Sequence, residues 1–184
     1  AFDGLAIYNI LASHDANVVI DVDGLAASAA SIVAMAGDDI RMAENALMMI
    51  HNADGFSMGT AKEMEKTAKI LRTLDSQLAI TYSQRSGTSI EEIASLMEAE
   101  TFFTAKEAKD AGLATEITEA KKMAAHFDPS KFAWLKNLPS DLLSVANPTC
   151  NIPEMADSLN PLIDTLVAEV TIKASKGSRF SFVR

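Results

Sequence analysis

The sequence has a single cysteine, Cys150, and no proline before residue 129. One thiol cannot form an internal disulfide, so the chain lacks the framework that stabilises many small secreted domains. The sequence also has no apolar run long enough to cross a bilayer, no signal-peptide pattern, and no cluster of cysteine and histidine with the spacing of metal ligands. We therefore expect a cytoplasmic protein that uses no metal and no cofactor and does not act on a membrane.

Positive charge is also scarce. The chain has 16 Lys and Arg against 25 Asp and Glu, which gives a net charge of −9. Binding to nucleic-acid phosphates requires clustered Lys and Arg, so this balance argues against a nucleic-acid partner. The length of 184 residues and the 48% hydrophobic content are enough for one core, or for a core with an appendage.

The prolines divide the chain, because all five lie between Pro129 and Pro161. We expect a compact domain over residues 1–120, followed by a linker or arm over residues 121–153. Residues 154–184 are expected to form a C-terminal helix and a basic tail. Apolar residues recur at helical spacing from Glu154 to about Ser175, and the basic stretch 173–179 reads as a mobile end.

Three helix starts can be recognised within the first 120 residues. Each begins with Thr or Ser followed three residues later by an acid, which is the capping-box pattern. The three capping residues are Thr60, Ser89 and Thr104. The first is expected to open a long amphipathic helix that runs to about Ser86, because apolar residues recur along it at helical spacing.

Ser28 is the first candidate functional residue. An apolar segment, 18–23, leads through the pentapeptide GLAAS at 24–28 into a small-residue helix, 31–36. A serine where a strand turns into a helix faces the positive end of the helix dipole and free backbone N–H groups. This environment suits a nucleophilic hydroxyl and an oxyanion. The same pattern also fits a small-residue turn at a tightly packed helix start.

A histidine and an acid follow farther along the chain. The apolar run 46–50 reads as a buried strand that ends at His51, and Glu100 comes just before two phenylalanines. Serine, histidine and acid in this order can act as nucleophile, base and orienting group. A lone histidine is, however, more often a satisfied surface or core residue. If the three residues form a triad, Ser28 Oγ should lie about 2.6–3.2 Å from one ring nitrogen of His51, and Glu100 should lie within the same reach of the other nitrogen.

Together these segments resemble the proteolytic subunit of Clp protease, and more closely the ClpP-like head maturation proteases of phages and prophages. Four stretches carry the resemblance: the helix at 2–9, the pentapeptide at 24–28, the Met-Ile-His motif at 49–51, and the region 98–113. They follow the order of the family at a similar spacing, and they cover roughly the first two-thirds of the chain. Each stretch alone is a weak signal, whereas the joint match is specific.

The resemblance implies an α/β fold of the ββα-superhelix type, with a long handle helix. It also implies a serine endopeptidase in which Ser28 is the nucleophile, His51 the general base and Glu100 the third member. Glu100 departs from the aspartate that is usual in Clp subunits, and its side chain is one methylene longer. The backbone N–H of Ala29 is the expected oxyanion donor. The second donor in the family comes from a glycine pair upstream of Phe2, so residues 1–120 are expected to be an N-terminally incomplete domain.

The resemblance further implies partners. Clp subunits form rings that stack and enclose their active sites, so we expect a homo-oligomer that acts on peptide or protein substrates. An ATPase unfoldase or phage capsid proteins are further expected partners, in a bacterial host or a phage prohead. Two alternatives remain open: a non-hydrolytic scaffold or degenerate prophage remnant, and a crotonase-type acyl-CoA enzyme, because crotonases share the fold.

Overall fold

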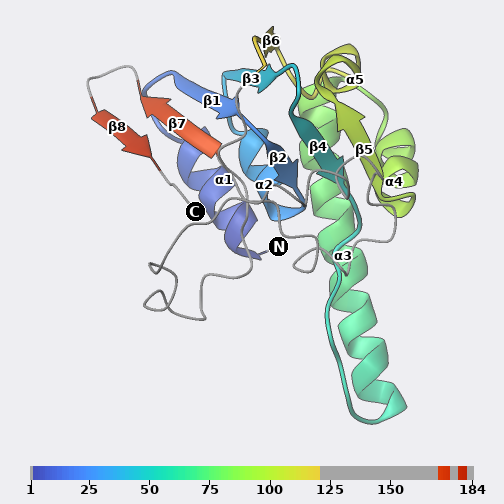
Figure 1. The fold of residues 1–184 in the computed structure, drawn as a ribbon. Coiled ribbons are helices and arrows are strands. Elements are labelled where there is room, and N and C mark those ends of the chain that lie inside the picture. The colour runs from blue at the N-terminus through green and yellow to red at the C-terminus, as the bar shows by residue number, and fades with distance from the viewer. Residues whose placement is uncertain (1, 121–169, 175–177, 182–184) are drawn as a thin grey trace, which may run out of the picture.

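The computed structural model describes residues 2–120, 170–174 and 178–181. These residues form a mixed α/β fold with two small sheets and helices packed against them (Figure 1). The helices are α1 (Phe2–Ala12), α2 (Ala29–Ala34), α3 (Ala61–Ser86), α4 (Ile90–Glu98) and α5 (Ala105–Asp110). The strands are β1 (Val18–Val22), β2 (Leu25–Ala27), β3 (Asp39–Ala43), β4 (Leu47–Ile50), β5 (Thr101–Thr104), β6 (Glu116–Thr118), β7 (Val170–Ala174) and β8 (Ser178–Ser181). The mixed α/β class expected from the sequence is confirmed.

The two sheets differ in the order and direction of their strands. The larger sheet has the strand order β6-β3-β1-β7-β8, with β1, β3 and β6 parallel to one another. The smaller sheet has the order β2-β4-β5, in which β2 runs parallel to β4 and β5 runs antiparallel to it. The chain moves from the larger sheet to the smaller one twice, through the short segments that join β1 to β2 and β3 to β4 (Figure 1).

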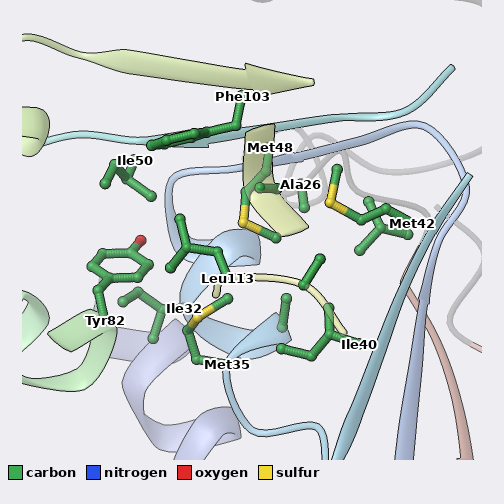
Figure 2. Packing of buried hydrophobic residues seen from close by; sticks show 14 of the residues in the cluster. Ala26, Ile32, Met35, Ile40, Met42, Met48, Ile50, Tyr82, Phe103 and Leu113 are labelled. Carbon is green, nitrogen blue, oxygen red and sulfur yellow. The ribbon is translucent and has the colours of Figure 1, made fainter. Parts of the chain in front are cut away.

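One continuous core joins the sheets to the helices. Figure 2 shows aliphatic and methionine side chains from both sheets packed against α2 and α3. Strand residues such as Ile20, Ile40, Met48 and Ile50 are fully buried. Apolar residues facing a core on both sides of a sheet explain why the short runs 18–22 and 47–50 carry almost no polar residues. On the opposite face of the smaller sheet, Met49 of β4 is buried against partly buried side chains of β2 and β5.

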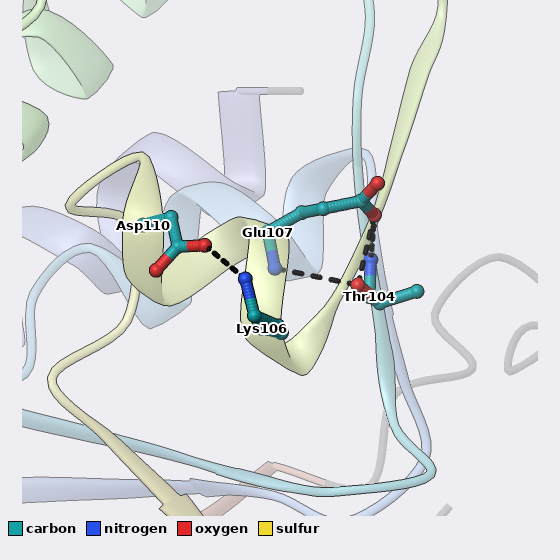
Figure 3. Close-up of polar contacts among 4 residues, drawn as sticks. All are labelled: Thr104, Lys106, Glu107 and Asp110. Carbon is teal, nitrogen blue, oxygen red and sulfur yellow. Dashed lines mark hydrogen bonds and ion pairs between the residues drawn. The ribbon is translucent and has the colours of Figure 1, made fainter.

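The helix starts form as the sequence predicts. The N–H of Thr60 donates to the Glu63 carboxylate at 2.7 Å, and the N–H of Thr104 donates to Glu107 at 2.8 Å. The N–H of Glu107 in turn donates to the Thr104 hydroxyl, which completes a reciprocal capping box (Figure 3). Figure 3 also shows the ion pair between Lys106 and Asp110 on the same helix. The Thr104–Glu107 contacts fix the start of α5 at the end of β5.

The longest helix, α3, extends well beyond the rest of the described fold (Figure 1). Its C-terminal half is anchored in the core, where Leu74, Leu78 and Tyr82 are buried. Its N-terminal half is accompanied by the segment that follows β4, which runs alongside the helix before the chain turns into it (Figure 1). The predicted handle helix is thus present as a helix. In the part of the chain that the structure describes, no helix is both long and apolar enough to cross a membrane.

The C-terminal part differs from the sequence-based expectation. Residues Val170–Ala174 form strand β7, which pairs antiparallel with β1, where we expected the end of a helix. Residues Ser178–Ser181 form β8 and pair with β7, where we expected a mobile basic tail. The prediction was wrong here because β-branched residues with alternating polarity fit a strand, and the open edge of β1 supplies a partner. The proposed arm at 121–153 and the helix before residue 170 lie outside the described residues.

Gly87 and Gly112 both have left-handed backbone conformations, so the costs of replacing each by alanine can be compared. Gly87 ends α3 with φ 75° and Gly112 follows α5 with φ 74°. A Cβ on Gly87 would meet no atom within 4 Å, whereas a Cβ on Gly112 would lie 2.6 Å from the Ser86 carbonyl oxygen. We expect Gly87→Ala to cost only the conformational penalty of about 1–2 kcal/mol. Gly112→Ala should cost about 1–3 kcal/mol more, from steric overlap with backbone.

Chemical unfolding of the two variants measures this difference. Equal losses of unfolding free energy would contradict the close packing of Gly112 on the end of α3. The comparison needs no activity assay, so it tests the fold independently of the site.

Candidate active site

The candidate residues lie at one end of the smaller sheet. Ser28 comes directly after β2, His51 directly after β4, and Glu100 directly before β5. Because β2 and β4 are parallel and β5 is antiparallel to them, these three positions fall at the same end of the sheet. The strand order therefore brings together residues that are 23 and 49 positions apart in the sequence, as counted from the residue numbers.

Ser28 occupies an unusual backbone conformation. Its φ of 57° and ψ of −122° lie outside the regions that L-residues normally adopt, at a cost of about 1–3 kcal/mol. The turn is held on both sides: the N–H of Ser28 donates to the Met49 carbonyl of β4 at 3.1 Å, and the Ser28 carbonyl accepts from the N–H of Ser31 at 3.1 Å. A strained turn from strand to helix presents the serine hydroxyl at the end of the sheet, away from the ladder.

The serine hydroxyl contacts the imidazole of the candidate base. Ser28 Oγ and His51 Nε2 are 2.8 Å apart, within the range expected for a nucleophile and its base. When Nε2 accepts the serine proton, as a general base must, the imidazole is neutral and its ring proton is on Nδ1. This is the tautomer that an acid on the Nδ1 side would favour.

The strand register brings the backbone of Glu100 near that of His51. In the β4–β5 ladder Ile50 pairs with Thr101 and Met49 pairs with Phe102. Continuing the antiparallel register by one residue sets His51 against Glu100. Glu100 has φ 51°, a left-handed conformation that forms the turn between α4 and β5. The N–H of Asn52 donates to the Met97 carbonyl at 3.2 Å, which holds the chain after His51 close to the end of α4.

Burial and nearby carboxylates shift the pKa of His51 in opposite directions. Partial burial lowers the pKa of His51 below its ordinary value, and this effect is the largest. The carboxylate of Asp54 raises the pKa of His51, followed in strength by Glu100 and then by Asp75. The net result is a pKa below that of a free histidine, so the imidazole is neutral, and able to accept a proton, at neutral pH.

A small cavity of about 40 Å³ adjoins the Ser28–His51 pair. Its walls include Ala29, whose N–H belongs to the first turn of α2, where backbone donors have no partner within the helix. α1 packs closely behind this turn: a Cβ on Gly4 would lie 3.0 Å from both Cβ and the carbonyl oxygen of Ala29. The glycine thus lets α1 support the residue next to the serine from behind.

Three residues of this region were missed by the sequence analysis. Asp54 lines the cavity, and Asp75 of α3 accepts the N–H of Ala53 at 2.7 Å. Tyr82, a buried residue of α3, also lines the cavity. Helical spacing predicts that Tyr82 faces the core, but nothing in the sequence shows that its hydroxyl meets α2. Within the described residues, no group of three or more potential ligands could hold a metal ion.

A serine on a strained strand-to-helix turn, hydrogen-bonded to a histidine at the end of the neighbouring strand, is an arrangement typical of α/β serine hydrolases. The comparison with protein families agrees with this class. A family model described as Clp protease matches residues 1–121. The match covers well over half of the sequence, and the chain belongs to the Clp protease family.

Individual curated relatives are similar to this chain over about two-thirds of its length. An "ATP-dependent Clp protease proteolytic subunit" from Bacteroides fragilis is 30% identical over 118 residues, covering 63% of this chain and 57% of the relative. A protein with the same name from Pleurastrum terricola is 34% identical over 122 residues, covering 65% and 61%. A third, from Chlorella vulgaris, is 28% identical over 125 residues, covering 67% and 62%. The match thus spans about three-fifths of the length of these relatives.

Proposed function

We propose that the protein is a serine endopeptidase that hydrolyses peptide bonds through Ser28, His51 and Glu100. The observation that supports this proposal most directly is the 2.8 Å contact between Ser28 Oγ and His51 Nε2 at the strained turn. Membership of the Clp protease family supports peptide hydrolysis as the reaction. The proposed roles are nucleophile for Ser28, general base for His51 and orienting acid for Glu100.

The proposed reaction is acyl transfer to the serine. Ser28 Oγ attacks the peptide carbonyl carbon while His51 Nε2 takes the hydroxyl proton. The carbonyl oxygen becomes an oxyanion and accepts a hydrogen bond from the N–H of Ala29. The C–N bond then breaks, and the imidazolium gives its proton to the leaving amine. Glu100 stabilises the imidazolium and keeps the ring in the required tautomer.

Water completes the cycle. The cavity beside the pair, at about 40 Å³, exceeds the roughly 10–15 Å³ that one water needs. A water placed there gives one proton to His51 and attacks the acyl carbon. The ester bond to Ser28 breaks, and the serine recovers its proton from the imidazolium. The product is a free carboxylic acid.

The assembly and the biological substrate are further parts of the proposal. By its likeness to Clp subunits, the protein is proposed to form a homo-oligomeric ring, or stacked rings, around its sites, and to work in the cytoplasm. The sequence resemblance to phage head maturation proteases supports capsid proteins as substrates, with an ATPase unfoldase as the other candidate partner. The proposed assembly, substrate and partner rest on resemblance to the family. The proposed roles of Ser28, His51 and Glu100 do not depend on them.

The proposal is tested by labelling with a fluorophosphonate, which reacts with activated serines. The wild-type protein should be labelled at Ser28, and Ser28→Ala should abolish the signal. Ser31→Ala is not a suitable control because Ser31 contacts the site. Ser95→Ala is suitable, because the Ser95 hydroxyl donates to the Glu91 carbonyl within α4, and it should leave labelling intact.

Identification of the labelled peptide by mass spectrometry decides the outcome. An unlabelled wild-type protein that is folded by circular dichroism would favour the non-hydrolytic scaffold. Labelling at another serine would contradict the assignment of Ser28. Hydrolysis of a fluorogenic peptide, but not of an acyl-CoA thioester, would separate the peptidase from the crotonase-type alternative.

A further inference from the structure

A chain of buried hydroxyl groups connects α3 to the carbonyl of Ser28. Ser31 Oγ lies 2.7 Å from the Ser28 carbonyl oxygen and 2.7 Å from the hydroxyl of Tyr82. Ser31 is 0% exposed and Tyr82 is 1% exposed, so both residues are shielded from bulk water. The ring of Tyr82 belongs to the same buried cluster as Ile32 and Ile50 (Figure 2).

The direction of both hydrogen bonds follows from the donors present. A carbonyl oxygen can only accept, so Ser31 must use its one proton on the Ser28 carbonyl. The bond between Ser31 and Tyr82 must then be donated by the tyrosine. The order is Tyr82 O–H to Ser31 Oγ, and Ser31 O–H to the Ser28 carbonyl. Each bond polarises the next, which strengthens the one that reaches Ser28.

The end point of this chain is the strained turn itself. The Ser28 carbonyl also accepts from the backbone N–H of Ser31 at 3.1 Å and of Ile32 at 3.4 Å. The side-chain bond of 2.7 Å is the shortest of the three. It orients the peptide plane between Ser28 and Ala29, and that plane carries the N–H proposed to bind the oxyanion. The unfavourable ψ of −122° at Ser28 is a rotation of this same plane.

We propose that Tyr82 and Ser31 are positioning residues that set the Ser28–Ala29 peptide plane, and with it the nucleophile and the oxyanion donor. This inference rests on the proposed function. Neither residue needs to touch the substrate for this role. Burial raises the pKa of Tyr82, so its hydroxyl is protonated and able to donate at neutral pH.

The first test compares two single variants of neighbouring buried residues on α3. Tyr82→Phe removes only the hydroxyl that donates to Ser31. Thr81→Val is the matched control, because the Thr81 hydroxyl is also buried but donates to the Gln77 carbonyl within its own helix. Misplacement of a reacting group by a fraction of an ångström is enough to slow chemistry, so Tyr82→Phe should react with the fluorophosphonate about tenfold more slowly. Thr81→Val should react at the wild-type rate.

Kinetics on a peptide separate positioning from a loss of structure. Tyr82→Phe should lower kcat and leave KM unchanged. Its rate should keep the wild-type pH midpoint, because that midpoint belongs to His51. A merely structural role would instead reduce the fraction of folded protein, visible in thermal unfolding, without changing the rate per folded molecule.

A double variant tests whether tyrosine acts through serine. Ser31→Ala removes the donor to the Ser28 carbonyl and leaves the Tyr82 hydroxyl buried without its acceptor. The double variant Ser31→Ala, Tyr82→Phe removes both groups and avoids that penalty. Adding Tyr82→Phe to Ser31→Ala should therefore cause no further loss of rate. An additional tenfold loss would overturn the proposed relay.

The remaining outcomes are also decisive. Equal labelling rates for Tyr82→Phe and Thr81→Val would overturn the positioning role while leaving the endopeptidase proposal intact. If the wild-type protein is not labelled at all, the proposed function fails instead. Crystal structures of the wild type and of Tyr82→Phe then decide the positioning role, because it requires that the φ and ψ of Ser28 change in the variant. An unchanged turn would overturn it.

Discussion

Replacement of His51 by alanine is expected to lower kcat for peptide hydrolysis by about 10⁶, close to the effect of Ser28→Ala. The two losses should be similar because the serine and the histidine act as one unit: a hydroxyl at neutral pH is a poor nucleophile until a base accepts its proton. The 2.8 Å contact makes His51 the group in position to do so. The double variant should be no slower than either single variant.

Steady-state kinetics with a fluorogenic peptide measure this effect, and His14→Ala is the control. His14 is exposed, and its Nδ1 accepts the N–H of Ala16 in the loop after α1. Its replacement should leave kcat unchanged. A His51→Ala protein that retained activity within tenfold of the wild type would exclude His51 as the base.

The second large effect concerns the acid that orients the imidazole. Glu100→Gln should lower kcat by about 10³–10⁴, because an amide in this place no longer stabilises the imidazolium or fixes the tautomer. Asp54→Asn should lower kcat by less than about fivefold, since the Asp54 side chain is exposed and charges in water interact weakly. The strand register, rather than the strength of the charge effect, is the reason to choose Glu100.

The pH profile distinguishes the two carboxylates further. Burial lowers the pKa of His51 from 6.5, so the acid limb of kcat/KM should have its midpoint below pH 6.5. Both Asp54 and Glu100 raise this pKa, so removing either charge should move the limb to lower pH. Only Glu100→Gln should also lower the plateau. Glu98→Gln, an exposed change on α4, is the control. A larger loss of kcat in Asp54→Asn would assign the role to Asp54.

The sequence was informative where local patterns decide the structure. Capping boxes at Thr60 and Thr104, a Ser89 side chain that caps α4, and the buried run before His51 all formed as predicted. The hydroxyl of Ser31, one turn into α2, bonds a backbone carbonyl of the preceding turn, a local contact of the same kind. These features depend on residues within one turn or one strand, so propensity and periodicity suffice to predict them.

The rest depended on contacts that no local pattern encodes. Strand β7 forms because β1 offers an open edge, and that edge is visible only in the folded sheet. The aspartate at residue 75 appears in the sequence as one polar position among many on a long helix, yet it binds the backbone next to the candidate base. Which carboxylate faces His51 likewise depends on the pairing of β4 with β5. The roles of Ser28, His51 and Glu100 stay predictions until they are measured.

The three-stranded sheet imposes a further constraint on how this sequence can change. Ser28, His51 and Glu100 are each joined directly to a strand residue, with no intervening loop to absorb a shift. Side chains alternate between the two faces of a strand, so inserting or deleting one residue in β2, β4 or β5 would turn a functional group to the opposite face. Length variation among related chains should therefore be absent from these strands and should gather in segments such as 52–60, where extra residues leave the ladder untouched.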